Sequence, residues 1–333
     1  MRHPPREPGA RVKRHPTALG LVAALLAAAT FGLSGSFMKP LLEAGWTPAA
    51  AVTVRALLGG FVLVPIAFIS IRGRWDSLWR ARWRVLGMGV IGVAATQFAY
   101  SSAVQRIPVD TAILIEYMAP LLLVLAVWVR NRRTPQLVVL LGSLVALAGL
   151  FFVVGPAIAS EGTRLDPLGL LFAVLAMVGC ALYFVIAARP SDGLPPVMFA
   201  CASLLVGGAI LVCVGVLGLA PIRATFTVVH LLGTTVPWWV PLIVLGVFAT
   251  AIAYVTSIAA SEILGSRVSS FLGMLEVVAA TAYAWLVIGE NLTIAKFVGG
   301  LLILAGIALV RAEKSPAVLE PSRARTPVES SGG

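Results

Sequence analysis

Residues 108–129, PVDTAILIEYMAPLLLVLAVWV, form an apolar stretch that is long enough to cross a bilayer but contains an acid. Glu116 lies in its outer half, and Pro120 follows one turn later. A charged side chain at the centre of a bilayer costs about 2.5–3.5 kcal/mol on insertion scales, so such residues usually face a cavity or a partner. A second apolar stretch, 268–288, carries Glu276 at a similar depth. We predict that both stretches are membrane helices whose acids face one polar cavity.

The composition excludes an ordinary soluble domain. Of the 333 residues, 59% are hydrophobic and 12% are charged, whereas soluble domains are about 45–50% apolar and about 25% charged. The mean hydropathy is +0.98. The formal charge of +11 comes from basic residues in short segments between apolar spans, and we read these as topology signals rather than as a nucleic-acid surface. Lipid is therefore the expected solvent for most of the surface.

Ten apolar spans follow one another along the chain, and we predict a membrane helix for each. The spans are 17–38, 48–71, 85–105, 109–129, 136–154, 166–188, 196–219, 237–261, 268–288 and 293–311. Each has roughly 19 to 25 residues, which is enough for about 30 Å of hydrocarbon at 1.5 Å per residue. The runs are continuously apolar rather than alternating, which excludes barrel strands. The expected fold class is therefore an all-α, polytopic membrane protein.

The basic residues predict the orientation. With the N-terminus inside, 19 of the 25 Lys and Arg residues fall in inner segments and five in outer ones, and Arg55 lies within a span. This bias places both termini in the cytoplasm of a multi-pass plasma- or inner-membrane protein. Residues 1–16 are then a basic cytoplasmic N-terminus, and 312–333 are a disordered cytoplasmic tail.

The two halves of the sequence resemble each other. LGLVAALLA at 19–27 resembles LGLLFAVLA at 168–176, and GVAATQFAY at 92–100 matches GVFATAIAY at 246–254 in six of nine positions. We predict a first five-helix repeat at 17–154, an outer linker at 155–165 and a second repeat at 166–311. Because five is odd, the second repeat is inverted in the membrane relative to the first. Inverted repeats around a site at the membrane midplane are typical of secondary transporters.

The sequence resembles the drug/metabolite transporter superfamily, with two EamA-type domains, over nearly all of 18–311. The resemblance rests on the two repeats, on VRALLGG at 54–60, IPVDTAILIEYMAPL at 107–121 and LEVV at 275–278, and on the closing IGE and GGLLILAGIAL segments of 288–309. Within the superfamily it is most similar to the threonine and homoserine exporter type. The resemblance implies ten helices and export of small metabolites, often amino acids. One departure is that Val277, not proline, follows Glu276, which puts a proline-dependent kink there in doubt.

Three charged residues within the spans are the main site candidates. Glu116 and Glu276 are predicted to bind a substrate amine or to accept a coupling proton, and the alternative is a structural acid hydrogen-bonded to neighbouring helices. Arg55 lies at a depth similar to that of Glu116. It is predicted either to pair with Glu116 or to bind a substrate carboxylate, and the alternative is a side chain that reaches out to the interface.

Uncharged polar residues form a second group of candidates. Gln97, Tyr100 and Tyr254 are predicted to line the cavity, although ordinary helix packing explains them equally well. Tyr117 is read as a packing or interface aromatic, and Glu290 as a turn residue at an outer helix end. The three cysteines, Cys180, Cys201 and Cys213, have no metal or redox spacing and are read as small buried hydrophobic residues.

No motif in the sequence predicts an enzyme or a cofactor site. GMGVIG at 87–92 fits GxGxxG, but it lies inside an apolar span with no strand before it. We expect a transporter that needs neither cofactor nor metal, whose partners are a small-molecule substrate, a proton or other coupling ion, and the bilayer, with no nucleic acid; a homodimer is possible. The alternatives are a drug or purine exporter of the same fold, or, from another class, a lipid flippase or an accessory of a membrane-embedded lipid enzyme.

Overall fold

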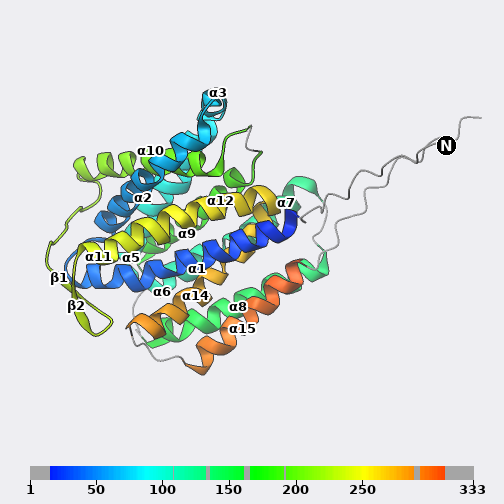
Figure 1. Ribbon diagram of the computed structural model, residues 1–333. Coiled ribbons are helices and arrows are strands. Elements are labelled where there is room, and N and C mark those ends of the chain that lie inside the picture. The colour runs from blue at the N-terminus through cyan, green and yellow to red at the C-terminus, as the bar shows by residue number, and fades with distance from the viewer. Residues whose placement is uncertain are drawn as a thin grey trace, which may run out of the picture.

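The computed structural model describes residues 16–107, 109–132, 136–160, 166–190, 193–288 and 293–311. Within these ranges the protein is mostly helical (Figure 1). Nearly all of the predicted N-terminal segment, the tail, residues 161–165 of the predicted linker and Glu290 lie outside the described residues.

The helices of the first half are separated by short connections. Their bounds are α1 Pro16–Glu43, α2 Pro48–Ile71, α3 Trp75–Arg80, α4 Arg82–Gly87, η1 Met88–Ala95, α5 Thr96–Val104, α6 Val109–Glu116, α7 Ala119–Asn131 and α8 Leu137–Ser160. The second half contains a two-stranded hairpin in addition to its helices. The bounds of the elements in this half are α9 Pro167–Ala187, α10 Pro196–Val216, β1 Val228–Leu231, β2 Thr234–Pro237, α11 Trp239–Ile243, η2 Val244–Ile252, α12 Ala253–Leu264, α13 Ser266–Gly273, α14 Leu275–Tyr283, η3 Ala284–Ile288 and α15 Ile294–Arg311.

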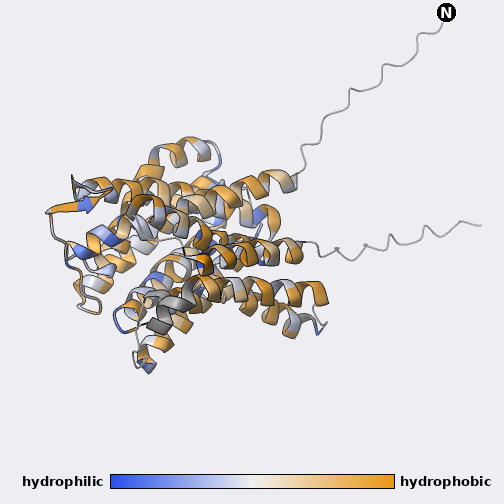
Figure 2. Ribbon diagram, turned by 90° about the horizontal axis from the view of Figure 1, so that it is seen from below, coloured by the Kyte–Doolittle hydropathy of each residue, from blue (hydrophilic) through white to orange (hydrophobic). Residues whose placement is uncertain are grey.

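Length and composition make this a multi-pass membrane protein. Eight continuous helical stretches are long and apolar enough to cross a membrane, and Leu137–Val153 and Ile294–Val310 are shorter apolar helices. Large apolar side chains lie on the outside of the bundle, for example Phe61 at 62% exposure and Ile69 at 69%. Figure 2 shows hydrophobic residues along the helices and hydrophilic ones mainly toward their ends. Such an extensive apolar exterior fits a lipid-facing surface.

Several segments differ from the sequence prediction; helix α8, for example, continues to Ser160, into the predicted linker at 155–165. Helix α1 continues to Glu43, whereas the predicted span ends at residue 38. The length of an apolar run indicates how much hydrocarbon the chain crosses, and the helix itself can extend beyond it. Residues 228–237 form an antiparallel hairpin in a chain predicted to be all-α. Its turn residues, Leu232 and Gly233, have φ angles of 53° and 72°, as a two-residue hairpin turn requires.

The repeat seen in the sequence is also a repeat of conformation. Segments η1 and η2 contain the starts of the matching GVAATQFAY and GVFATAIAY stretches, and both are π-helical. At matching positions, a threonine hydroxyl donates to a carbonyl five residues earlier: Thr96, directly after η1, to Ile91 at 2.7 Å, and Thr250, within η2, to Leu245 at 2.8 Å. The π-helix is a rare conformation, and where it occurs it is often at a functional site. Its occurrence at both positions is therefore a specific likeness between the halves.

Packing between the halves is reciprocal. Helices α2 and α10 pack together, as do α8 and α15 (Figure 1). A Cβ built on Gly60 would meet Leu205 Cδ2 at 2.7 Å, and one built on Gly208 would meet Leu57 Cδ2 at 2.6 Å. The two contacts are equivalent under the repeat, because Gly208 and Leu205 lie 148 positions after Gly60 and Leu57. Helix α1 packs on η2 and α12, and the matching α9 packs on η1 and α5.

The close approach of α8 and α15 gives a stability prediction. A Cβ on Gly299 would lie 2.6 Å from the Gly149 carbonyl oxygen, whereas one on the adjacent Gly300 would meet its nearest atom, in Val278, at 3.7 Å. We expect Gly299→Ala to destabilise the protein by about 1–3 kcal/mol, because backbone atoms must separate. Gly300→Ala is the matched control and should be neutral or stabilising, since alanine is the better helix former. Thermal unfolding in detergent measures both, and equal melting temperatures would contradict the prediction.

Candidate functional site

The two stretches that carry the intramembrane acids are each interrupted near the acid. Between α6 and α7, the Met118 N–H donates to Ile115 at 3.1 Å and the Leu121 N–H to Met118 at 3.0 Å. Between α13 and α14, Met274 and Val277 make the matching bonds, both at 3.1 Å. These bonds span three residues rather than four, a tightening that often marks a functional hinge when it occurs within a helix.

The causes of the two interruptions differ. Pro120 lies at the start of α7 and has no N–H to donate to the Glu116 carbonyl. The second interruption forms without proline, directly after Gly273, a residue type that weakens helices. The doubt about this kink is thereby answered, because the helix is interrupted even with valine after Glu276. Glu276 lies in the first turn of α14, where the helix dipole favours an acidic side chain.

Arg55 lies near both acids. Its side chain comes from α2, is 8% exposed, and interacts electrostatically with both Glu116 and Glu276. Its Nη1 donates to the Ser34 hydroxyl of α1 at 3.2 Å. Within the described part of the chain, Arg55 forms no ion pair, so the direct pairing with Glu116 considered from the sequence is not formed in this structure. The buried position also excludes a side chain that reaches the interface.

Aromatic and amide side chains complete this cluster. Tyr117, in the first interruption, lies next to Glu276 and Glu116. Tyr254 of α12 is 5% exposed and lies next to Gln97 and Arg55. The structure therefore brings together five of the six predicted site residues, from both halves of the chain. We call Arg55, Gln97, Glu116, Tyr254 and Glu276 the central polar cluster.

Tyr100 has different surroundings from its sequence counterpart Tyr254. It packs against a small apolar cluster formed by α5, α6 and α9 around Ala103, Ile107 and Ala173. Tyr254 instead contacts the rings of Phe31 and Tyr183, with centroids 5.4 and 5.7 Å away. A lining role for Tyr100 stays a prediction.

Sequence reasoning missed three neighbours of the central polar cluster. Tyr117 was assigned to packing, Cys180 was read as an inert small residue, and Ser34 was not considered. Cys180 of α9 lies close enough to both Glu116 and Glu276 for electrostatic interaction. The only available signal was the position of Tyr117 beside the acid and before the proline. Nothing in the sequence distinguishes Ser34 or Cys180 from other small residues of apolar helices.

The central polar cluster combines a guanidinium group and two carboxyl groups with neutral hydrogen-bonding groups. A guanidinium group suits a carboxylate, because its N–H donors match the two oxygens. Two carboxylates suit a cation or a transferable proton. Ionisable side chains inside a membrane span usually face the interior and mark a pathway for a substrate or ion. The arrangement is therefore suited to a small zwitterionic molecule.

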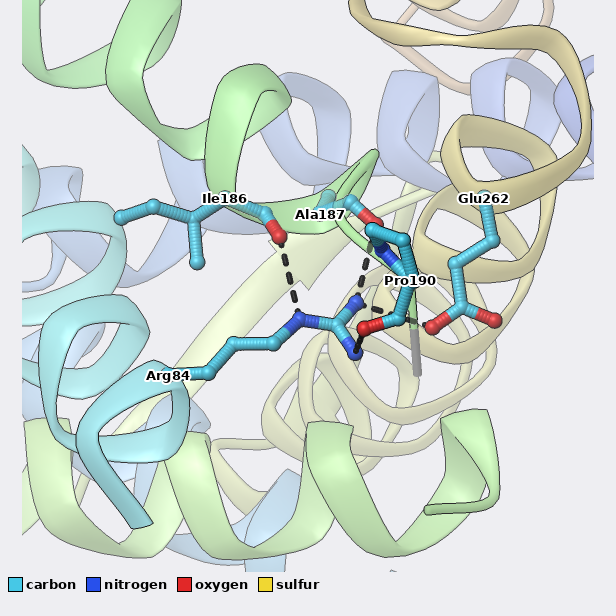
Figure 3. Close-up of polar contacts among 5 residues, drawn as sticks. All are labelled: Arg84, Ile186, Ala187, Pro190 and Glu262. Carbon is cyan, nitrogen blue, oxygen red and sulfur yellow. Dashed lines mark hydrogen bonds and ion pairs between the residues drawn. The ribbon is translucent and has the colours of Figure 1, made fainter. Parts of the chain in front are cut away.

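A second polar group lies where α4, α9 and α12 meet (Figure 3). Arg84 forms an ion pair with Glu262 at 2.8 Å, and the side chains are 7% and 17% exposed. The same guanidinium donates to the carbonyls of Ile186 at 3.1 Å, Ala187 at 3.0 Å and Pro190 at 3.4 Å. From the sequence, Arg84 was counted only as a topology signal and Glu262 was not considered, because two residues 178 positions apart carry no sign of their contact.

Comparisons with known proteins agree with this fold. YicL, an uncharacterized inner membrane transporter of Salmonella typhimurium, is 23% identical over 88% of this chain and 95% of its own length. Uncharacterized transporters of Clostridium kluyveri and Archaeoglobus fulgidus are 22% and 24% identical over 86% and 87% of this chain, and over 91% and 95% of their own lengths. One solved crystal structure superposes with a TM-score of 0.66 at 21% identity, covering 89% of this chain and 96% of that one. The model of the EamA-like transporter family matches residues 18–155 and 167–312. The chain belongs to the EamA-like transporter family.

Proposed function

We propose that this protein is a secondary transporter that exports a small polar metabolite, an amino acid or a related compound, by alternating access. The observation that carries the proposal is the central polar cluster, in which a buried arginine from one half lies near acids from both halves. Membership of a transporter family and the names of the relatives support transport. Within the superfamily, we assign the chain to the threonine and homoserine exporter type.

The proposed architecture is ten membrane helices in two inverted five-helix repeats, with both termini in the cytoplasm. The eight long spans together with the two shorter apolar helices support the count. The family model matches the chain twice, once in each half, and the matching π-helices and reciprocal glycine contacts support the repeat. Inverted repeats commonly place the substrate site at their interface, on interrupted helices.

In this proposal each group of the central polar cluster has a role. Arg55 binds the substrate carboxylate, and Glu116 and Glu276 bind the amine or carry a proton in antiport. Gln97 and Tyr254 line the site, and Tyr100 lines the path to it. The two interruptions, at Met118 and Met274, give the helices that carry the acids a place to bend while the halves rock against each other.

The carboxylate role of Arg55 predicts a change in specificity. In proteoliposomes, we expect Arg55→Lys to lower amino-acid efflux by about tenfold, because lysine keeps the charge but loses the paired donors. Efflux of the matching decarboxylated amine should change little. The exposed Arg189 provides the control variant Arg189→Lys. Equal losses for the amino acid and the amine would contradict carboxylate recognition by Arg55, and wild-type protein that moves neither compound would contradict the proposed substrate class.

A further inference from the structure

The connection between α2 and α4 concentrates arginine and tryptophan to an unusual degree. Residues 72–83 contain Arg72, Arg74, Arg80 and Arg82, and the acid among them is Asp76. Three of the eight tryptophans of the chain, Trp75, Trp79 and Trp83, lie within the same segment. From the sequence, these arginines are topology signals only, which leaves the indoles between them without a role. We call residues 72–83 the Arg-Trp segment.

The Arg-Trp segment lies at a membrane boundary. It begins where the span Pro48–Ile71 ends and runs into the span Arg82–Val104. Helix α3 stands at the end of α2, at the edge of the bundle (Figure 1). One side of the segment is fixed to the protein, because Ser77 and Ala81 are both 2% exposed and Leu78 packs against the main core.

The other side of the segment is open. Trp79 and Trp83 are each 71% exposed, and Trp75 is 47% exposed. Trp75 stacks edge-on against Phe68 of α2, with ring centroids 5.3 Å apart, and Phe68 is itself 52% exposed. The Trp75 indole is therefore continuous with the apolar face of α2. Three large exposed aromatic rings beside such a face fit a lipid interface, where tryptophan is enriched, better than open water.

Two arginines of the segment, Arg74 and Arg82, contact backbone carbonyls or aromatic rings rather than carboxylates. The Arg82 guanidinium lies 4.7 Å from the Trp79 ring centroid and 5.6 Å from that of Trp83, and it donates to the Trp79 carbonyl at 2.9 Å. Arg74 donates to the Ser70 carbonyl at 2.9 Å. Among the described residues, no carboxylate forms an ion pair with any arginine of the segment. Most of the five N–H donors on each guanidinium are therefore available to an external anion.

We propose that the Arg-Trp segment binds the headgroups of anionic phospholipids in the leaflet where α2 ends and α4 begins. Guanidinium groups pair with phosphate through parallel hydrogen bonds. Basic side chains next to a membrane are attracted to anionic lipid. The indoles occupy the headgroup layer and hold Arg82 at the depth of the phosphates. The surface thus combines positive charge with an apolar edge, and an anionic lipid supplies the complement of both.

Lipid selectivity in a reconstituted bilayer tests this proposal. The full-length protein is placed in phosphatidylcholine with a trace of spin-labelled phosphatidylglycerol or spin-labelled phosphatidylcholine, and the motionally restricted fraction of each is measured. We expect wild-type protein to prefer phosphatidylglycerol by about fivefold. Joint replacement of the four arginines by glutamine should bring the ratio close to unity. Arg189→Gln removes an exposed arginine elsewhere and should leave the ratio unchanged.

A second variant covers the case in which loss of four charges disturbs insertion. Trp79→Leu with Trp83→Leu keeps every charge, and it should lower the preference at least twofold because Arg82 loses its two aromatic neighbours. Equal binding of the two lipids by wild-type protein would overturn the proposal, as would an unchanged preference in both variants. Inorganic phosphate is added in a parallel sample against chloride of equal ionic strength. Selective loss of the preference with phosphate would identify a site for soluble anions instead of lipid.

Discussion

Glu116→Gln is expected to reduce substrate efflux by about 30-fold or more while leaving the protein folded. The carboxyl group lies at the end of α6, immediately before the interruption, and shares its surroundings with Glu276 and Arg55. Glutamine keeps the volume but removes the capacity to ionise and to exchange a proton. A hydrogen bond between this carboxyl group and a charged substrate amine is worth about 1.5–3 kcal/mol, and about 2 kcal/mol corresponds to a factor of about 30. The measurement is efflux of labelled amino acid from proteoliposomes.

Two further variants show whether the loss is specific to this position. Glu276→Gln should reduce efflux to a similar degree, because Glu276 is the acid that the second half contributes to the central polar cluster. Glu43→Gln, at the exposed end of α1, is the control and should transport at the wild-type rate. Wild-type efflux in Glu116→Gln would refute the proposed role of this carboxyl. An equal loss in all three variants would indicate a general defect rather than a role in substrate binding or coupling.

Exchange measurements separate binding from proton coupling. If Glu116 carries the coupling proton, Glu116→Gln should still exchange labelled for unlabelled amino acid at equal concentrations, because exchange needs no net proton movement. If Glu116 binds the amine, exchange should fall together with net efflux. Both results are consistent with a role for the residue, and they assign it to one of the two steps.

The helix positions could be predicted because the membrane imposes them. Hydrocarbon requires a run of apolar residues for each crossing, so the bounds of α2, 48–71, were predicted from composition alone. All of the hairpin at 228–237 except its last residue lies outside the predicted apolar spans, so it was not subject to that constraint. Its pattern of valine and threonine was a usable strand signal, but leucine at a turn position with positive φ is uncommon and obscured the turn.

The members of the central polar cluster that could be predicted are those whose side chains have a high free energy of insertion into lipid. Arg55, Glu116 and Glu276 stand out because a charged group inside an apolar span needs an explanation. Ser34 and Cys180 cost little in any environment, so only the packed structure places them near the charges. The contact between Arg84 and Glu262 was hidden for a different reason. Both residues lie near span ends, where charges are common, and their pairing depends on how α4 and α12 meet.

That contact gives the largest expected effect on stability, through Arg84→Met. The substitution removes the donor to three carbonyls at the end of α9 and beyond it, and leaves Glu262 without its cation. Breaking a buried ion pair by removing one member costs about 3–5 kcal/mol. Because Glu262 is 17% exposed, water offsets part of the loss, and we expect about 3 kcal/mol. The guanidinium also lies 4.1 Å from the Phe199 ring centroid, so methionine preserves part of the packing while removing the charge.

A double-mutant cycle isolates the ion pair from the carbonyl contacts. Glu262→Gln should cost about 1 kcal/mol, because the amide oxygen still accepts from Arg84. Once Arg84 is methionine, the same change should cost nothing or be stabilising, since the carboxylate then has no cation to pair with. Arg72→Met, at the exposed end of α2, is the control and should leave the melting temperature in detergent unchanged. If Arg84→Met melts at the wild-type temperature, the contact does not hold α4 to α9 and α12, and the two halves must be joined at this end by apolar packing alone.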